Sequence, residues 1–138
     1  MKKILFAASE AVPFMKTGGL ADVTGSLPKY FDKKNYDVRV ILPKYVCMEE
    51  RWKGQLHFLC HFYVNLSWRK QYVGIFETTY DGITYYLVDN EFYFAGNAPY
   101  NNIYEDVEKF AFFSKAVLEA LPYLDFCPDI IHCHDRQT

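Results

Sequence analysis

The stretch KILFAASEAVPFMKTGGLADV, residues 3–23, decides the fold class. It opens with an apolar run over residues 3–8, which is typical of a strand buried on both faces in a parallel sheet. Pro13 and the pair Gly18 and Gly19 follow this run, and apolar side chains at helical spacing begin next. A strand, a glycine-containing loop and a helix in this order predict the start of a β-α-β unit.

The residues that follow complete this unit. Apolar side chains recur every three or four positions over residues 20–31 and predict a helix, with Asp22 in its first turn. Pro28 is expected to kink or end that helix. Residues 37–43, DVRVILP, predict the second strand.

The middle of the chain has a different pattern. Residues 56–68, 71–79 and 83–88 are strand-like runs rich in Tyr, Phe, Val and Ile, and Asp81 and Gly82 supply a two-residue hairpin turn. We expect these runs to form an inserted antiparallel excursion. Residues 90–102 combine Gly, Pro and Asn with several aromatic side chains, which is typical of a loop.

A long helix and a short strand close the chain. Residues 105–123 place apolar side chains at helical spacing up to Pro122, and residues 130–134 predict a short buried strand. A parallel strand is normally followed by a helix that covers it, and here only a few residues remain. We therefore expect one truncated domain over residues 1–138, which could self-associate through the uncovered sheet.

The predicted fold class is α/β, a Rossmann-like, doubly wound and mostly parallel sheet with an antiparallel hairpin excursion.

Composition limits the possible partners. The net charge is −2 and no basic face is visible, so nucleic acid is not an expected partner. No apolar run approaches the roughly 20 residues that cross a bilayer, and four cysteines without a CxxC pair or a secretory signal favour reduced thiols in the cytoplasm.

The first candidate site lies between the first strand and the first helix. Gly18 and Gly19 let the backbone adopt positive φ or approach a ligand closely, and the amides that begin the helix favour an anion. Lys16 adds a mobile positive charge. The stretch matches neither GxGxxG nor the P-loop pattern. The alternative is that the two glycines only make a tight turn and that Lys16 is solvated.

The second candidate site is the run His132, Cys133, His134 and Asp135 at the end of the last strand. Alternate residues of a strand share a face, so the two histidines should point together. Three interpretations compete: a metal site, a histidine whose hydrogen bonds are satisfied without chemistry, and a ligand site beyond the carboxyl end of a strand. We expect no metal, because too few further ligands are available, and no cofactor.

Other aromatic and histidine side chains have structural explanations. His57 and His61 are expected on one face of a hairpin, where packing accounts for them better than ligand binding. Tyr and Phe at residues 85–86 and 92–94 could form a sugar-stacking platform, although core packing explains most of them. Tyr100 is the ring least expected in the core, and Glu105 with Asp106 is expected to cap the helix start.

Two motifs together resemble a known family. SEAVPFMKTGGLADVTGSLP at residues 9–28 and PDIIHCHDRQT at residues 128–138 closely resemble the start of bacterial glycogen synthases of the ADP-glucose-dependent starch synthase type. The resemblance implies a GT-B glycosyltransferase with two Rossmann-like halves, of which the C-terminal half is absent from this chain. It implies transfer of glucose from ADP-glucose to the 4-hydroxyl end of an α-1,4-glucan, with retention at the anomeric carbon.

The resemblance also implies roles for individual residues. Lys16, Gly18 and Gly19 would approach the sugar diphosphate of the donor, and Asp22 and Tyr100 would lie on the sugar side. His134 would be the catalytic residue near the transferred glucosyl unit, where it orients the sugar and stabilises developing charge rather than acting as a nucleophile.

One residue departs from the family pattern, because Arg136 stands where the family usually has Trp. The alternative function is a free-standing, non-catalytic module of Rossmann type that binds a nucleotide sugar or phosphate. The length of the gene would distinguish the synthase from the non-catalytic module. We expect the 138 residues alone to be inactive.

Overall fold

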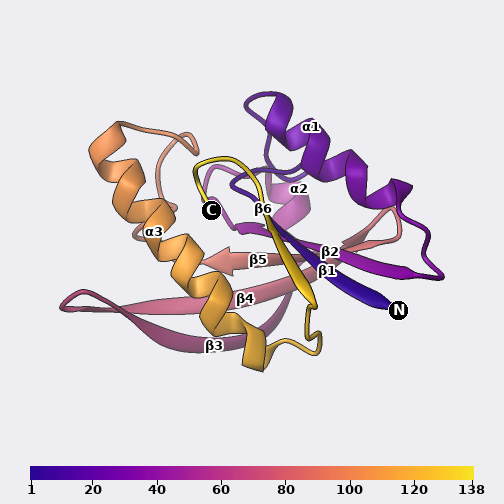
Figure 1. The fold of residues 1–138 in the computed structure, drawn as a ribbon. Coiled ribbons are helices and arrows are strands. Elements are labelled where there is room, and N and C mark those ends of the chain that lie inside the picture. The colour runs from indigo at the N-terminus through magenta and orange to yellow at the C-terminus, as the bar shows by residue number, and fades with distance from the viewer.

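The computed structural model describes residues 1–138 and contains one six-stranded sheet in the order β3-β4-β5-β2-β1-β6 (Figure 1). The strands are β1 (Lys2–Ala7), β2 (Tyr36–Pro43), β3 (His57–Leu66), β4 (Arg69–Tyr80), β5 (Ile83–Asp89) and β6 (Ile130–Cys133). The helices are α1 (Gly19–Ser26), α2 (Glu50–Lys53) and α3 (Ile103–Ala120), with 3₁₀ turns η1 (Leu27–Tyr30) and η2 (Leu121–Tyr123). The predicted α/β class is confirmed.

The parallel half of the sheet consists of β1, β2, β5 and β6. β1 pairs in parallel with both β2 and β6, and β2 pairs in parallel with β5. β1 is buried from Ile4 to Ala7, as the apolar run predicts for a strand covered on both faces. The carboxyl ends of these four strands meet at one edge of the sheet.

The antiparallel excursion is shorter than expected. β3 pairs with β4 and β4 pairs with β5 in antiparallel orientation, but β5 also pairs with β2 in parallel, with Val40 opposite Tyr85. The excursion therefore consists of the β3–β4 hairpin, and β5 belongs to both parts. Asp81 and Gly82 have φ angles of 52° and 79°, so the predicted hairpin turn is confirmed.

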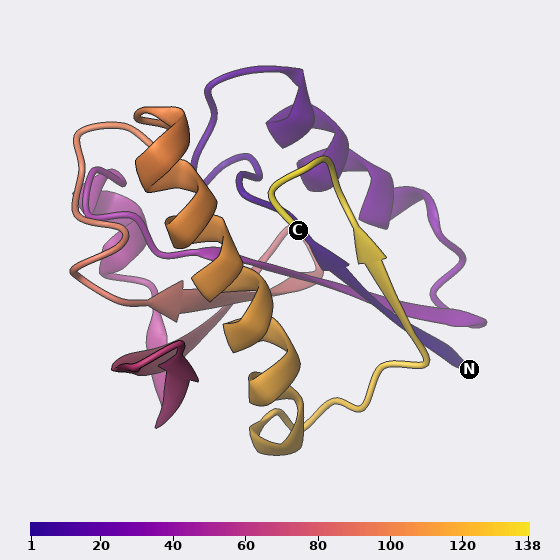
Figure 2. The same ribbon diagram turned by 60° about the vertical axis from the view of Figure 1, so that its left-hand side comes forward.

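Layers on the two faces of the sheet make it doubly wound (Figure 2). α3 covers one face, where its Phe112, Phe113 and Val117 belong to a core cluster with side chains of β1, β2 and β5. The other face carries a smaller cluster around Phe14 and Val40. The segment after α1 joins this second layer, because the ring of Phe31 packs edge-on against Phe6 at 6.1 Å between centroids.

Helix ends follow their capping residues. α1 ends at Ser26 and continues as the 3₁₀ turn that contains Pro28, which confirms that this proline ends the helix. α3 begins two residues earlier than the apolar pattern predicts, because the Asn102 side chain accepts a hydrogen bond from the Glu105 amide. None of the helices is long and apolar enough to cross a membrane.

β6 differs from its predicted environment. A buried strand was expected at residues 130–134, but Ile130, His132 and Cys133 are exposed. The reason is topological, because β6 pairs only with β1 and forms one edge of the sheet in this chain.

Candidate active site

The candidate site lies where β1 and β6 end side by side. The His134 amide donates a hydrogen bond of 3.0 Å to the Ala7 carbonyl, and the Ala8 amide donates to the Ile41 carbonyl of β2. Both loops that sequence motifs single out leave the sheet at this point. Figure 2 shows the last residues of the chain turning back between α1 and α3. The two candidate motifs therefore contribute to one site.

A buried carboxylate, which sequence reasoning missed, organises the loop between β1 and α1. Glu10 is only 2% exposed. One of its carboxylate oxygens, Oε2, accepts hydrogen bonds from both the amide and the hydroxyl of Thr17, at 2.9 and 2.6 Å. The Glu10 carbonyl accepts a third bond, of 2.6 Å, from the Thr24 hydroxyl on α1. The available signal was a glutamate three residues after the end of a strand with an apolar run.

Lys16 and Asp22 form an ion pair at the mouth of the site, with 2.9 Å between Nζ and Oδ2. Both side chains are about half exposed, so this pair contributes at most about 1 kcal/mol to stability. The family resemblance placed Lys16 on the diphosphate and Asp22 on the sugar side, whereas the structure brings the two side chains together. A weak exposed pair of this kind leaves Lys16 free to exchange its partner for an anion.

Gly18 and Gly19 begin α1 without a side-chain cap. Gly18 has an extended backbone with φ of −164°, so of the two reasons considered for a glycine here, positive φ does not apply to Gly18. A Cβ atom at either glycine would meet no other atom within 4 Å. Neither internal packing nor backbone geometry requires glycine here, which supports the close approach of a ligand to the uncapped amides.

Tyr100 joins the site through its hydroxyl group, which lies 2.6 Å from Ser9 Oγ. The Tyr45 hydroxyl donates to the Ser9 carbonyl at 2.6 Å, so Ser9 connects three loops. The prediction that Tyr100 stays out of the core is wrong in part, because its ring packs against Phe110 and the larger core. Burial raises the pKa of Tyr100, and its hydrogen bond with Ser9 opposes this shift. Tyr100 is therefore a neutral hydroxyl at neutral pH.

His134 is 9% exposed and packs against Phe6 at 4.7 Å and His132 at 4.3 Å between ring centroids. The two histidines thus share a face, as predicted. Burial lowers the pKa of His134, and the neighbouring His132 lowers it further, so the imidazole is neutral at pH 7. Its Nε2 atom is buried without a hydrogen-bond partner in the chain. Since buried polar atoms are normally paired, the partner of Nε2 is expected to come from a ligand.

Arg136, in place of the usual Trp of the family, lies on the surface beside the site. It lines a groove of about 500 Å³ together with Gln137, Thr138 and the outer side of α3. The substitution therefore leaves a solvated cation where an indole would contribute an apolar surface.

Two remaining expectations concern metal ligands and helix capping. No group of three or more His, Cys, Asp or Glu side chains is arranged to hold a metal ion.

Of the two acidic residues expected to cap α3, Asp106 accepts hydrogen bonds from the Asn101 amide at 3.0 and 3.2 Å. The buried Lys109, which was not anticipated, fixes the preceding loop by donating to the Pro99 carbonyl and Asn101 Oδ1.

The position of the site fits a general rule for open α/β sheets. The crossover through α1 leads from β1 to one side, and the crossover through α3 returns to β6 on the other side of β1. Ligands bind at such switch points, outside the carboxyl ends of the strands. The chain therefore has a Rossmann-like α/β fold with its candidate ligand site at this switch point.

Comparison with known proteins narrows this class. A family model described as the starch synthase catalytic domain matches residues 3–138, and the chain belongs to this family. The chain is 68% identical over 138 residues to a glycogen synthase of Lachnoclostridium phytofermentans and 63% identical to that of Lachnospira eligens. Both alignments cover 100% of this chain and 29% of the relative. The chain therefore spans less than a third of the length of these relatives.

A solved structure has the same fold. The catalytic domain of starch synthase IV from Arabidopsis thaliana, bound to ADP and acarbose, aligns with a TM-score of 0.85 and 30% identity. The alignment covers 99% of this chain and 28% of that protein. The Rossmann-like assignment is thus supported by both sequence and structure.

Proposed function

We propose that the protein containing this chain is a glycogen synthase, which transfers glucose from ADP-glucose to the non-reducing end of an α-1,4-glucan with retention of configuration. The observation that carries this proposal is the buried, neutral His134, whose unpartnered Nε2 lies at the switch point of a starch synthase family sheet. The names of the relatives and the ADP and acarbose bound to the Arabidopsis protein support both substrates.

The donor diphosphate would bind at the start of α1. The uncapped amides after Gly18 point at the incoming anion, and the absence of a Cβ at Gly18 and Gly19 leaves room for its oxygens. Lys16 would leave Asp22 and pair with the diphosphate, which carries more charge than one carboxylate. Glu10 positions this segment through Thr17 and does not itself need to touch the donor.

The sugar would lie between α1 and the end of β6. Asp22, released from Lys16, and the neutral hydroxyl of Tyr100 can hydrogen-bond sugar hydroxyls. His134 would hold a hydroxyl of the transferred glucosyl unit through Nε2 and so fix the ring as positive charge develops at the anomeric carbon. A neutral imidazole avoids repulsion with an oxocarbenium-like transition state, and His134 is not required as a nucleophile.

The complete protein would have the GT-B architecture, with residues 1–138 as part of the N-terminal Rossmann-like domain and a second domain across the cleft. We expect the 138 residues alone to be inactive, because both domains position donor and acceptor. A cytoplasmic location fits the nucleotide-sugar donor. Self-association of the isolated chain would use the exposed Ile130 of β6 and the groove beside Arg136.

The experiment is incorporation of labelled glucose from ADP-glucose into glycogen by the complete protein, followed by determination of the anomeric configuration of the new linkage. Formation of α-1,4 linkages supports the proposal. Tight binding of ADP-glucose without any transfer would instead favour the alternative, a non-catalytic nucleotide-sugar module.

A further inference from the structure

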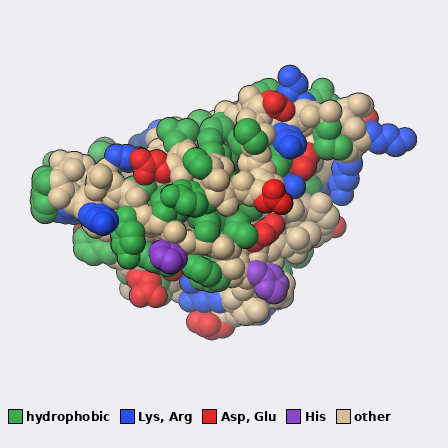
Figure 3. Space-filling model, turned by 90° about the horizontal axis from the view of Figure 1, so that it is seen from below, with side chains coloured by type: hydrophobic (Ala, Val, Ile, Leu, Met, Phe, Trp, Pro, Cys, Tyr) green, Lys and Arg blue, Asp and Glu red, His purple; other side chains and the backbone are tan.

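Charged and histidine side chains outside the candidate site lie almost entirely at the surface. Figure 3 shows such side chains on the face of the molecule seen from below. A β-bulge between Phe58 and Cys60 leaves the partners of His57 and His61 three residues apart on β4, so the two histidines lie on opposite faces of the hairpin. The expectation that they share a face is wrong for this reason, and they form no ligand cluster.

Lys109 on α3 is the exception among these charged side chains. It is 4% exposed, and it is the only buried residue among the fifteen Lys and Arg of the chain. Burying an ammonium group costs free energy unless its protons find acceptors. The partners of Lys109 therefore indicate what this buried charge does.

Both hydrogen-bond partners of Lys109 belong to the loop before α3. The Nζ atom of Lys109 donates to the Pro99 carbonyl at 2.8 Å and to Asn101 Oδ1 at 2.6 Å. Asp106 Oδ1 lies further away, at 3.7 Å, so it offsets the charge of the ammonium group without a direct hydrogen bond. Lys109 thus bonds to the residues on both sides of Tyr100.

This loop depends on side chains for its conformation. Residues 95–101 make no hydrogen bond between backbone atoms. Their anchors come from α3, where Lys109 holds the Pro99 carbonyl and both carboxylate oxygens of Asp106 accept from the Asn101 amide. A segment with so few bonds of its own has low local stability, so the loss of one anchor should release it.

Tyr100 connects this loop to the proposed donor site. Its ring packs against Phe110 on α3, with 5.9 Å between the centroids, and its hydroxyl group lies 2.6 Å from Ser9 Oγ. Ser9 is fully buried, and the next residue, Glu10, accepts both hydrogen bonds from Thr17. A displacement of Tyr100 would therefore affect both the sugar side of the site and the loop that leads to α1.

Lys115, on the same helix, makes a comparable contact away from the site. Its Nζ atom donates to the Asn65 carbonyl of the β3–β4 hairpin. Asn65 also pairs with Lys70 in the antiparallel ladder, so the hairpin keeps its conformation without this contact. Lys115 and Lys109 therefore share their chemistry, but only Lys109 anchors a loop that has no backbone hydrogen bonds of its own.

We propose that Lys109 is a positioning residue for the reaction, because its two hydrogen bonds hold residues 99–101 where the Tyr100 hydroxyl group can meet the donor sugar. This inference rests on the proposed function, which places Tyr100 beside the sugar of ADP-glucose. Lys109 is buried and bonds only to the loop, so it does not itself touch the donor. Its effect on the reaction passes through Tyr100.

The test is a double-mutant cycle in the complete protein. Lys109→Met keeps an apolar stem but removes the donors, and Tyr100→Phe removes only the hydroxyl group. We expect each variant to raise the KM for ADP-glucose by about five- to tenfold with little change in kcat, as for the loss of one hydrogen bond to the donor. The double variant should be no worse than the more impaired single variant. Partial unfolding alone would lower the apparent kcat and leave KM unchanged.

Two further variants complete the design. Lys115→Met is the matched control and should keep the wild-type KM. Asn101→Ala removes one acceptor of Lys109 at an exposed position, so it is expected to fold even if Lys109→Met does not, and it should show the same coupling with Tyr100→Phe. Amide exchange gives a readout independent of activity, because residues 95–101 should exchange faster in Lys109→Met than in Lys115→Met.

The outcomes separate this inference from the proposed function. If the wild type transfers glucose but the effects of Lys109→Met and Tyr100→Phe multiply, or Lys109→Met behaves like Lys115→Met, the positioning role is refuted and the synthase activity stands. If the wild type binds ADP-glucose without transfer and the dissociation constants show the same coupling, the positioning of Tyr100 is supported and the synthase activity is refuted. If the wild type neither binds ADP-glucose nor transfers glucose, both are refuted.

Discussion

A single carboxylate oxygen of Glu10 accepts both hydrogen bonds that Thr17 can donate, from its amide at 2.9 Å and from its hydroxyl at 2.6 Å. Glu10 lies three residues after the end of β1, and Thr17 directly precedes the glycines that begin α1. The buried Glu10 therefore determines where the amides of the proposed donor site lie.

Replacing Glu10 by Ala should leave the Thr17 donors unpaired and lower the free energy of unfolding by about 1–3 kcal/mol. Glu10→Gln keeps an acceptor oxygen and should recover part of this loss. In the complete enzyme we expect Glu10→Ala to raise the KM for ADP-glucose, with partial rescue in Glu10→Gln. Equal KM values in the wild type and a folded Glu10→Ala variant would argue against a positioning role.

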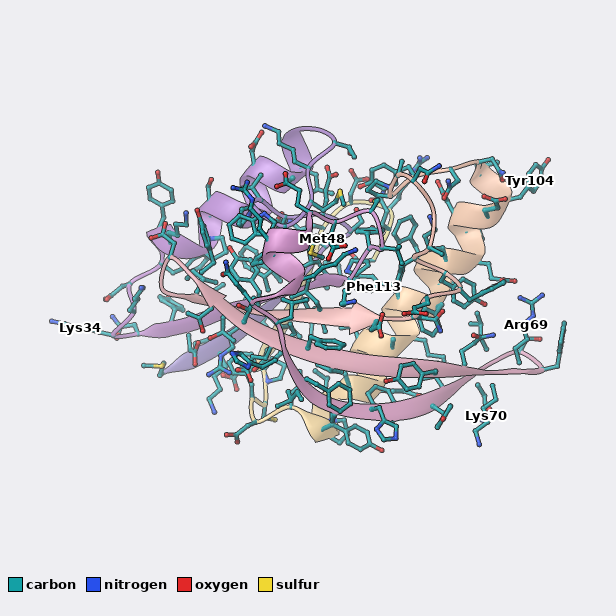
Figure 4. All side chains as sticks on the ribbon, turned by 180° about the vertical axis from the view of Figure 1, so that it is seen from behind. Lys34, Met48, Arg69, Lys70, Tyr104 and Phe113 are labelled. Atoms are coloured by element: carbon teal, nitrogen blue, oxygen red, sulfur yellow. The ribbon has the colours of Figure 1, made fainter.

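Lys16→Ala should chiefly raise the donor KM, because the diphosphate is charged in both the ground and the transition state. Loss of the exposed pair with Asp22 should change stability by less than about 1 kcal/mol. Lys34→Ala is a suitable control, since Lys34 is also exposed and lies far from the site near β2 (Figure 4). Steady-state kinetics at varied ADP-glucose would contradict the assignment if Lys16→Ala and Lys34→Ala behaved alike.

His134→Ala should lower kcat by on the order of 10²-fold while donor affinity stays near normal, by analogy with removal of one transition-state hydrogen bond. The exposed neighbour His132 provides the comparison, and His132→Ala should have a much smaller effect. Kinetics and melting temperature are measured on the same preparation. A folded His134→Ala enzyme with near-normal kcat would remove His134 from the reaction.

Two glycines of the same segment should respond in opposite ways. Gly18→Ala places a methyl group in open space, so stability should change little while donor binding weakens. Gly25→Ala places its Cβ 2.3 Å from Val12 Cγ2 and 2.7 Å from the Val12 carbonyl oxygen. The free energy of unfolding should therefore fall by about 1–3 kcal/mol. Thermal melts and ADP-glucose titration of both variants distinguish a ligand-facing glycine from a packing glycine.

Acid should destabilise the fold through His134. Its pKa is lower in the folded than in the unfolded chain, so the unfolded state binds more protons as the pH falls through the unfolded value of about 6.5. The stability contributed by the neutral imidazole is complete above that pH and is lost progressively toward the lower folded pKa. Urea titrations between pH 8 and 5 should show a smaller pH dependence for His134→Gln. An identical pH dependence would mean that another group dominates.

Local patterns predicted most of the fold. The apolar run of β1, the turn at Asp81 and Gly82 and the helix end at Pro28 each depend on neighbouring residues in the sequence, and all three are confirmed. The dual pairing of β5 and the bulge of β3 depend on partners in other strands, and periodicity alone could not reveal them.

The candidate site was also predictable from the sequence only in part. Its position at the ends of β1 and β6 follows from topology, so both motifs could be placed from the sequence. The contacts between side chains could not, because the ion pair of Lys16 with Asp22 and the bond of Tyr100 to Ser9 join segments whose separation is set only by folding. Glu10 was missed because its role depends on burial.

The pairing of β6 with β1 has a consequence for the lifetime of the site. β6 contributes four residue pairs at the edge of the sheet, and the Lys3 amide bonds to Asp129 across a sequence separation of 126 residues. Closing so long a loop is slow relative to forming the hairpins, so His134 reaches its position late in folding. A short edge strand also opens without unfolding the rest. Amide exchange at residues 130–134 of this chain should therefore outpace exchange in the central strands, so His134, the proposed catalytic residue, can leave its position while the remaining sheet stays folded.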